Sequence, residues 1–408
     1  MTIVFTVSAP GKVILNGEHS VVYDKPALAG VVGLRTNVTL KETDNDYVKA
    51  VFDSFPDISP SYHLNTLNEL LKKLQKKFNV VDLLNELETE HDAFLVIVQQ
   101  FVQENTQLDG ISDEQKSIMH KIMTGIVYLL AALEVNYAAS NGIESALKRG
   151  FNIEFKSQIP IGAGLGSSAA FAVCVAAIFH VYALTHSQPN FVRTFVETAS
   201  EEERQFFNNT VSSWAYQSER IMHGTPSGLD NTVCTFGNVV QYTKTPKKFI
   251  NIALKSPINI MLVNTGVSRN TSEIVHKVRE LKNDHTNVIE FIFDAMGALV
   301  DDVVQILENV NEVSDVENYM QLKRLFYINN NLLRALGVSH PVLEEIFATS
   351  ERLGFCAKLT GAGAGGFAII LLPPSYAGSK AFHNLSKELS HFETNVTTIG
   401  GTGLQISE

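Results

Sequence analysis

Apolar residues fall in short runs near the N-terminus, and their pattern predicts β-strands there. Four such runs are bounded by polar or turn-forming residues: 2–7, 13–15, 27–34 and 36–40. Pro10-Gly11 stands between the first two runs, and a Pro-Gly pair is typical of a turn. We therefore expect the N-terminal part of the chain to be rich in β structure.

Helical spacing replaces the strand pattern farther along the chain. Apolar residues recur every three or four positions over 64–78, which predicts an amphipathic helix, and a second stripe of this kind covers 118–137. Four lysines lie on the first helix, where a solvated face is the better interpretation than a basic ligand-binding patch: Lys72, Lys73, Lys76 and Lys77. Residues 87–110 are polar and show no clear period.

A strand, a glycine-rich loop and a helix follow one another in the middle of the chain. Polar and apolar residues alternate over 152–158, as in a half-exposed strand, and an alanine-rich helix is predicted over 169–183. Ser200 followed by Glu203 is a capping-box pattern, which should open another helix that ends near Gly224.

The pattern of apolar and polar residues changes after Gly237, and we place a domain boundary near residue 240. This gives an N-terminal domain, 1–240, and a C-terminal domain, 241–408. The second domain is predicted to hold one strand, four helices and two β runs separated by glycines: 259–264, then 270–282, 287–309, 317–336 and 341–353, then 355–359 and 367–372.

Composition and charge restrict the classes of partner. The 408 residues are 45% hydrophobic and 18% charged, which is typical of a globular protein and excludes a disordered one. Acidic residues outnumber basic ones by 43 to 32, and the net charge of −11 leads us to expect no nucleic acid and no membrane as partner. An anionic metabolite would have to be bound by a local positive field.

The cysteines and the apolar segments indicate the compartment. The three cysteines are Cys174, Cys234 and Cys356, and without a Cys-x-x-Cys pair they exclude a disulfide framework and a cysteine zinc site. Cys174 lies in an apolar run and is expected in the core. Residues 169–183 are too few for a membrane helix, and no signal peptide is recognisable, so a cytoplasmic location is expected.

The most informative stretch is PIGAGLGSSAA at 160–170, between the predicted strand and the alanine-rich helix. Its glycines allow the backbone to approach a ligand, and the N-terminus of the helix offers unpaired N–H groups to an anion. Ser167 and Ser168 add hydroxyl groups for phosphate or Mg²⁺. A flexible turn with a serine cap is the plain alternative, but the strand–loop–helix context favours a phosphate site. The stretch is neither a Walker A loop nor a Rossmann fingerprint.

Two other segments are weaker signals when each is taken alone. LTGAGAGG at 359–366 joins two β runs, so it is either a tight hairpin turn or a loop that approaches a substrate phosphoryl group. In the N-terminal segment, Lys12 could merely protect a strand edge, and the pair Glu18-His19 is more often a surface feature than a site.

Two acids lie near the loop at 223–231, HGTPSGLDN. Glu219 precedes this loop on the predicted helix, and Asp230 lies near its end. Kinase chemistry needs one carboxylate for Mg²⁺ and often a second to accept the hydroxyl proton, although singly each is more often a surface acid. For His223, in the last turn of the helix, a favourable interaction with the helix dipole is the plain alternative to a role in a site.

Three separated motifs together resemble, in order and spacing, the signatures of the GHMP small-molecule kinases, named for galactokinase, homoserine kinase, mevalonate kinase and phosphomevalonate kinase. They are APGKVILNGEH at 9–19, PIGAGLGSSAA at 160–170 and LTGAGAGGF at 359–367. The resemblance implies an α+β fold of two domains, a ribosomal protein S5 domain 2-like N-terminal domain and a ferredoxin-like C-terminal domain, with the active site between them. The loop at 223–231 and the apolar Val21-Val22 after Gly-Glu-His are most similar to the branch that phosphorylates mevalonate, since galactokinases have Asp where Val21 stands.

The resemblance also implies a reaction and a role for each matching residue. The expected reaction is transfer of phosphate from ATP to the 5-hydroxyl of (R)-mevalonate, which gives 5-phosphomevalonate and ADP on the route to isoprenoids and sterols. Asp230 and Lys12 would be catalytic, and Ser168 and Glu219 would hold Mg²⁺. The ATP phosphates would be bound by Gly162, Ala163, Gly164, Leu165, Gly166, Ser167 and Ser168. The acceptor would be bound by Lys12, Glu18, His19, Asp230, Thr271 and Gly363.

Some alternatives remain open in the sequence. A sibling kinase for another alcohol or phosphate is one, and a non-catalytic ligand sensor on the same fold is another, although the presence of Lys12, Ser168, Glu219 and Asp230 argues against the sensor. The residues do not decide whether Asp230 acts as a base or only orients the hydroxyl. By resemblance we expect a homodimer and inhibition by prenyl diphosphates, and residues 41–115 match no motif.

Overall fold

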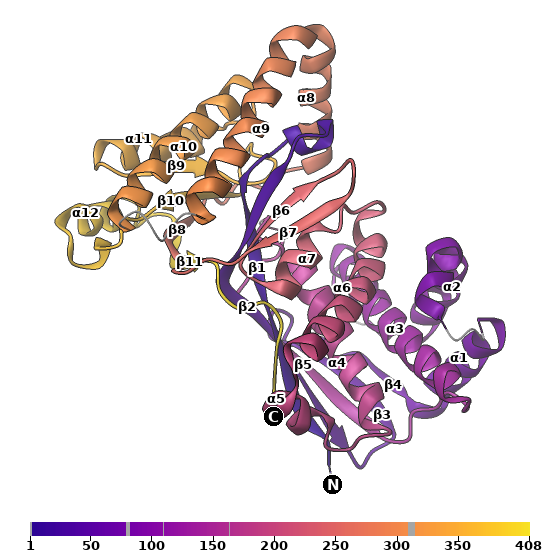
Figure 1. Cartoon of the computed structure of the whole chain (residues 1–408). Coiled ribbons are helices and arrows are strands. Elements are labelled where there is room, and N and C mark those ends of the chain that lie inside the picture. Colours follow the sequence, from indigo (N-terminus) through magenta and orange to yellow (C-terminus); the bar gives the residue numbers. More distant parts are fainter. Residues whose placement is uncertain (1, 79–81, 109, 163, 309–314) are drawn as a thin grey trace.

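The protein consists of two lobes that share one sheet (Figure 1). The computed structural model describes residues 2–78, 82–108, 110–162, 164–308 and 315–408. In the described chain the C-terminal lobe carries α8–α12, and the N-terminal lobe carries α1–α7, with both chain termini at its lower end in Figure 1. The predicted α+β class is confirmed.

The sheet has an N-terminal and a C-terminal part. The C-terminal part has the order β11-β8-β10-β9, and the pair Ile399–Val32 joins it to β2. In the N-terminal part, β2 pairs with β1, β5 and β6, and β3 runs parallel to β5. The strands of this part are β1 (Val4–Asn16), β2 (Ala27–Thr43), β3 (Tyr47–Phe52), β4 (Ser61–His63), β5 (Gly150–Ser157), β6 (Val239–Thr243), β7 (Lys248–Ile252) and β12 (Gln405–Ser407).

The turn predicted at Pro10-Gly11 is wrong. β1 continues through these residues, and its pairing with β2 shifts in register between Pro10 and Lys12, as at a β-bulge. The Lys12 backbone N–H donates to the Leu165 carbonyl at 2.8 Å. A bulge can redirect a side chain, and this one lies where β1 meets the loop before α4. The runs 27–34 and 36–40 likewise form the single strand β2.

The predicted helices of the N-terminal lobe are present. The capping box is confirmed, because Ser200 Oγ accepts from the Glu203 N–H at 3.2 Å and Glu203 Oε2 accepts from the Ser200 N–H at 2.7 Å. The four lysines on α1 are exposed, as predicted. The helices are α1 (Leu64–Lys77), α2 (Leu83–Asn105), α3 (Asp113–Asn141), α4 (Ser167–Thr185), α5 (Phe191–Thr198), α6 (Glu201–His223) and α7 (Leu229–Phe236), with the 3₁₀ turn η1 (Ser20–Tyr23).

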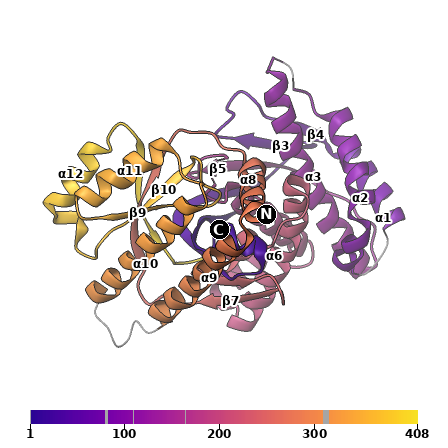
Figure 2. The same ribbon diagram turned by 90° about the horizontal axis from the view of Figure 1, so that it is seen from above.

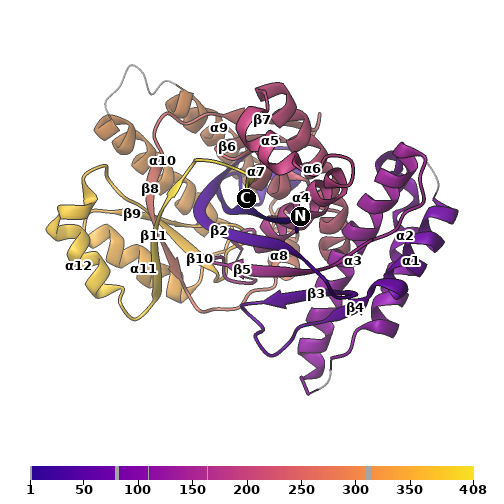
Figure 3. The ribbon, with the colours of Figure 1, turned by 90° about the horizontal axis from the view of Figure 1, so that it is seen from below.

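Helix α2 lies where the sequence showed no clear period. Its buried side chains include Leu87, Phe94, Val98 and Phe101, which form one stripe, whereas the apolar Val96 lies on another face and is exposed. α1 and α2 pack with α3, and Figure 3 shows this group with β3 and β4 at the end of the molecule opposite α11 and α12. Residues 41–115 therefore form much of one end of the N-terminal lobe.

The C-terminal lobe follows its predicted pattern closely. Successive residues of β8 face opposite sides, with Ile260 and Leu262 in one core and Met261 and Val263 in the other, which explains their continuous apolar run. Its strands and helices are β8 (Ile258–Asn264), α8 (Thr271–Asp284), α9 (Thr286–Glu308), α10 (Asp315–Ala335), α11 (Pro341–Arg352), β9 (Cys356–Leu359), β10 (Phe367–Leu371), α12 (Lys380–Glu388) and β11 (Glu393–Ile399), with the 3₁₀ turn η2 (Tyr376–Gly378).

Strands that follow the predicted domain boundary in the sequence pair with the sheet of the N-terminal lobe, and a turn from the N-terminal part packs on the C-terminal lobe. The division near residue 240 falls inside β6, whose hairpin with β7 is bonded to β2, and the last strand, β12, returns to β1. In the other direction, η1 at the tip of the β1–β2 hairpin packs on α9 (Figure 2). There the rings of Tyr23 and Phe293 stack, with 4.5 Å between their centroids. The division 1–240 and 241–408 stays a prediction.

Two helices are long and apolar enough to cross a membrane by length and composition alone. They are α3 and α4, and 78% of the relevant window of each is buried inside the protein. α4 packs between the sheet and α3, α6 and α7. Its Cys174 is buried, as predicted for a core cysteine.

Candidate active site

A cavity of about 710 Å³ is lined by residues of both lobes. Its polar end contains side chains from β1, α4, α6 and α7, from the start of α8 and from the segment just before it. These are Lys12, Ser167, Ser168, Glu219, His223, Asp230, Arg269 and Thr271. Its other end is mainly apolar, although Asp53, Ser54 and Lys121 also line it. The apolar residues are Phe52, Phe55, Ile118, Ile122, Phe155, Ile159, Ile161 and Phe171. Residues 41–115 thus supply part of the apolar wall.

The first glycine motif forms the loop predicted for it. Gly162, Gly164 and Gly166 have φ of 73°, 81° and 73°, in the left-handed region that favours glycine. Gly166 caps α4 without any side-chain hydrogen bond, so the first N–H groups of this helix remain open to an anion. Leu165 is buried beneath the loop, and Ala163 lies outside the described residues.

Lys12 and Asp230 meet across the cavity. The Lys12 ammonium lies 2.9 Å from Asp230 Oδ2. Asp230 stands in the first turn of α7, where the helix dipole favours a carboxylate, and Gly228 at φ 84° opens that helix. A Cβ on Gly166 would come within 2.7 Å of Lys12 Cγ. The lysine stem is therefore held between the loop and the acid, which joins two of the sequence motifs.

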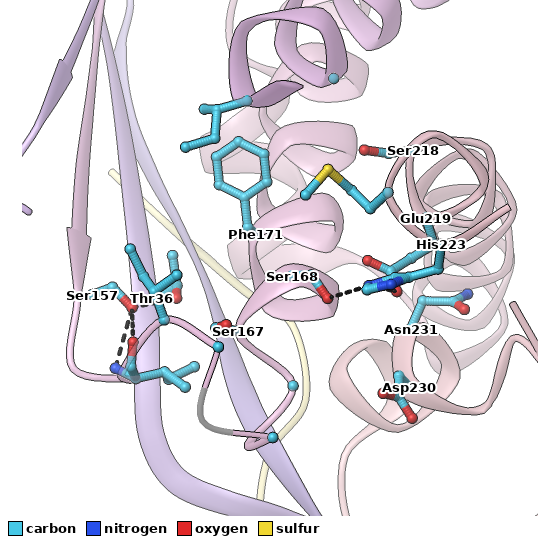
Figure 4. Close-up of a pocket in the computed structure, with 18 of the residues that line it drawn as sticks. Thr36, Ser157, Ser167, Ser168, Phe171, Ser218, Glu219, His223, Asp230 and Asn231 are labelled. Carbon is cyan, nitrogen blue, oxygen red and sulfur yellow. Dashed lines mark hydrogen bonds and ion pairs between the residues drawn. The ribbon is translucent and has the colours of Figure 1, made fainter. Parts of the chain in front are cut away.

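Glu219 is a buried carboxylate with an unsatisfied oxygen. Only 3% of the residue is exposed, and Oε1 has no hydrogen-bond partner in the described part of the chain. Burial, with the nearby charge of Asp230, raises the pKa of Glu219 to about 7. Ser168 and His223 point toward each other beside it (Figure 4), with 3.2 Å between Ser168 Oγ and His223 Nε2 and 3.7 Å between that nitrogen and Glu219 Oε2.

Arg269 is a site residue that the sequence did not single out. Its guanidinium lies between the two glycine loops, since a Cβ on Gly164 would come within 1.7 Å of Nη2 and one on Gly361 within 3.0 Å. Nη1 donates to the Thr360 carbonyl at 3.0 Å, and burial lowers the pKa of the arginine. The signal for it is spatial, because glycines far apart in the chain make room for one side chain.

The acceptor residues predicted by resemblance divide into two groups. Lys12, Asp230 and Thr271 line the cavity, as does Ala362 of the second glycine loop. Glu18, His19 and Gly363 do not line it. Their role as substrate contacts stays a prediction.

The residues behind the cavity are engaged with protein atoms. The Glu18 carboxylate is fully buried and pairs with Lys358. His19 Nε2 donates to the Ala362 carbonyl at 2.9 Å, and burial lowers the pKa of this histidine. A Cβ on Gly363 would come within 2.2 Å of the Val338 carbonyl, so this glycine allows close packing of the loop.

Comparisons with known proteins show the family of the chain. Residues 128–238 match the GHMP kinases N terminal domain, and residues 304–391 match the GHMP kinases C terminal model. A mevalonate kinase of Gibberella zeae is 32% identical over 98% of this chain and 77% of its own length. The mevalonate kinase of Homo sapiens is 30% identical over 99% of this chain and 95% of its own length. The crystal structure of the L. major mevalonate kinase in complex with R-mevalonate has a similar fold, with a TM-score of 0.61 and 20% identity over 96% of this chain and 94% of that one.

Proposed function

The chain belongs to the mevalonate kinases of the GHMP kinase family, and we propose that its cavity transfers the γ-phosphoryl group of ATP to the 5-hydroxyl of mevalonate. The observation that carries the proposal is the Lys12–Asp230 pair at 2.9 Å, which shares one cavity with the glycine loop before α4. An acid, a cation and an anion-binding loop together are what phosphoryl transfer to an alcohol requires.

Asp230 and Lys12 have different roles at the acceptor hydroxyl. The acceptor oxygen forms a bond to the γ-phosphorus while the bond from that phosphorus to the bridging oxygen of ADP breaks. Asp230 accepts the proton of the attacking hydroxyl, and Lys12 offsets the charge that develops on the transferred group. The ammonium also holds the carboxylate in place before the substrate arrives.

The donor would lie along the length of the cavity. The open N–H groups at the start of α4 and the glycines at 162, 164 and 166 suit its phosphates. The apolar end, between Phe52, Phe155 and Phe171, suits a flat aromatic base. Arg269 is placed to contact the phosphoryl group that passes between the two loops, since its planar guanidinium matches phosphate oxygens.

Glu219 and Ser168 fit a magnesium ion. The buried Oε1 of Glu219 has no protein partner among the described residues, and the Ser168 hydroxyl lies on the same side of the cavity. A magnesium ion beside ATP is commonly held by one or two protein groups together with phosphate and water. When bound, the ion would neutralise phosphate charge.

Release of ADP from MgATP in a coupled assay tests the function. We expect turnover with mevalonate and none with galactose, homoserine or phosphomevalonate. Turnover with one of the other acceptors alone would keep the phosphate site but refute the acceptor. Binding of MgATP without turnover of any of the four would favour the sensor.

Three expectations from the resemblance also belong to this proposal. We propose that the protein is a cytoplasmic homodimer and that prenyl diphosphates inhibit it. The molar mass in solution tests whether the protein is a dimer. The effect of a prenyl diphosphate on the KM for ATP tests the inhibition.

A further inference from the structure

A buried ion pair lies behind the cavity, outside the residues that line it. The side chains of Glu18 and Lys358 are both fully buried and form an ion pair. The ammonium also donates to the Leu359 carbonyl at 2.8 Å, and Asn329 Nδ2 donates to the other oxygen of Glu18 at 3.1 Å. Both charges are thus held by several fixed partners.

The pair joins two segments that are 340 positions apart in the sequence. Glu18 follows β1, which carries Lys12, and Lys358 lies in β9, which leads into the second glycine loop. A second connection lies beside it, because the Thr360 hydroxyl bonds to both the N–H and the carbonyl of Ile14 at 3.0 Å. The two segments therefore form one unit behind the acceptor end of the cavity.

The turn that carries Glu18 has an unusual backbone. Gly17 has φ of 91° and His19 has φ of 64°, a region that residues other than glycine seldom adopt. Such a conformation persists where its surroundings fix it, and it often marks a functional region. Here Glu18 is held by Lys358, and the His19 imidazole donates to the Ala362 carbonyl at 2.9 Å.

A contribution to stability alone does not account for this arrangement. Buried ion pairs are often replaceable by apolar side chains without loss of stability, and Lys358 already lies against an apolar neighbour, with its ammonium 5.8 Å from the centre of the Phe326 ring. What an apolar side chain could not do is hold Glu18 and the Leu359 carbonyl at fixed positions. The arrangement therefore specifies geometry.

We propose that Lys358 is a positioning residue for the acceptor. Through Glu18 it fixes the turn at 17–19 and the segment at 360–362, and so places Gly361 and Ala362 opposite Lys12 and Asp230. The inference rests on the proposed function and extends it, because it assigns Glu18 an indirect role in place of the direct substrate contact that the resemblance implies.

The test is Lys358→Met in the full-length chain, with mevalonate and MgATP varied separately. Because the side-chain hydrogen bonds of Glu18 and Lys358 in the described chain reach Ile14, Asn329 and Leu359 and no residue of the donor loop, we expect the KM for mevalonate to rise roughly 10- to 100-fold while the KM for MgATP changes less than about twofold. An unchanged KM for mevalonate would overturn the proposal, and so would an equal rise in both KM values.

A double variant separates positioning from folding. Glu18→Gln with Lys358→Met removes both buried charges, so we expect thermal stability to recover while the KM for mevalonate stays high. Recovery of that KM together with stability would show a merely structural role and would overturn the proposal. The double variant also supplies the measurement if Lys358→Met alone does not fold.

Glu134→Gln is the matched control. Glu134 is buried to a similar degree and interacts with His186 at 3.2 Å in the N-terminal lobe, outside the cavity lining. We expect it to change stability without the selective effect on mevalonate, and a selective effect there would contradict the assignment to Lys358. If the wild-type enzyme uses another acceptor, the proposed function fails, and the KM for that acceptor still tests Lys358.

Discussion

Two glutamates on opposite sides of the cavity are equally buried and have opposite surroundings. Glu18 and Glu219 are each 3% exposed. Glu18 accepts hydrogen bonds from Lys358 and Asn329. Glu219 has one oxygen without a partner in the described chain, and its pKa is raised to about 7, first by burial and then by Asp230. One carboxylate is neutralised by the protein, whereas the other keeps an oxygen with no partner in the described chain.

The difference separates a preformed acceptor side from an incomplete donor side. A buried charge is unfavourable unless it is paired. The fold satisfies Glu18 by itself, whereas in the proposed function a cation would complete the site at Glu219. In the second loop, Gly363 and Gly365 are packed against the backbone of Val338 and Val267. In the donor loop, Gly164 and Gly166 instead face the side chains of Arg269 and Lys12, and a Cβ on Gly162 would meet no atom within 4 Å.

Removal of Asp230 should have the largest effect on this comparison. Asp230→Ala removes the proton acceptor and the partner of Lys12, so kcat should fall by roughly 10²- to 10⁴-fold while ATP affinity changes little. It also removes the charge that helps to raise the pKa of Glu219, which should therefore decrease. Steady-state kinetics measure the first effect, and a near-normal kcat would exclude Asp230 as the base.

Replacement of the paired glutamate should be strongly destabilising. Glu18→Gln leaves the fully buried Lys358 ammonium without its counter-charge, and breaking a buried pair in this way typically lowers the free energy of unfolding by about 3–5 kcal/mol. Urea denaturation measures it, with the exposed Glu154→Gln as control. A loss similar to that of the control would mean that Lys358 is neutralised in another way.

The same replacement at Glu219 should have the opposite sign. Because its folded-state pKa of about 7 exceeds the ordinary 4.5, the folded protein loses stability as pH rises from 4.5 through 7. Without Mg²⁺, Glu219→Gln should therefore raise the free energy of unfolding by about 3 kcal/mol at pH 8 and by about 1 kcal/mol at pH 5. Urea denaturation in EDTA at both pH values measures the gain, and a loss at pH 8 would show that the carboxylate is already satisfied.

Much of the fold could be predicted because its signals are local. The capping box at Ser200 and Glu203 and the apolar stripe of α1 each lie within a few residues, and the structure contains both elements. The prediction failed at Pro10-Gly11, where a turn signal was overridden by pairing of β1 with β2 and by the bond from Lys12 to Leu165. α2 was missed because apolar residues outside its buried stripe, among them the exposed Val96, obscure the helical period.

The site was predictable from single motifs only in part. The glycine loop before α4 was expected from its own residues, whereas the roles of Lys12 and Asp230 followed from the resemblance to the GHMP kinases. Gly162, Gly164 and Gly166 of this loop line one cavity with Lys12 and Asp230. Arg269 and Lys358 were not assigned a role, because what defines them is distance in space. Arg269 needs glycines from both loops beside it, and Lys358 pairs with a residue 340 positions away. The sequence within a few residues of Arg269 or Lys358 gives no signal of these contacts.

Ser168→Ala should have the smallest effect on the kinetics. It tests whether Ser168 belongs to the donor side or to the acceptor side of the cavity. The hydroxyl lies next to His223 and on the same side of the cavity as Glu219, so its loss should remove one contact to the cation. A hydrogen bond or ligand contact to a charged group corresponds to roughly a tenfold change, which should appear in the KM for MgATP and diminish as Mg²⁺ is raised. Ser168→Thr keeps the oxygen and is the matched control. If Mg²⁺ gives no rescue and the KM for mevalonate rises instead, Ser168 belongs to the acceptor side. The proposed cation at Glu219 would then be bound without a contact from Ser168.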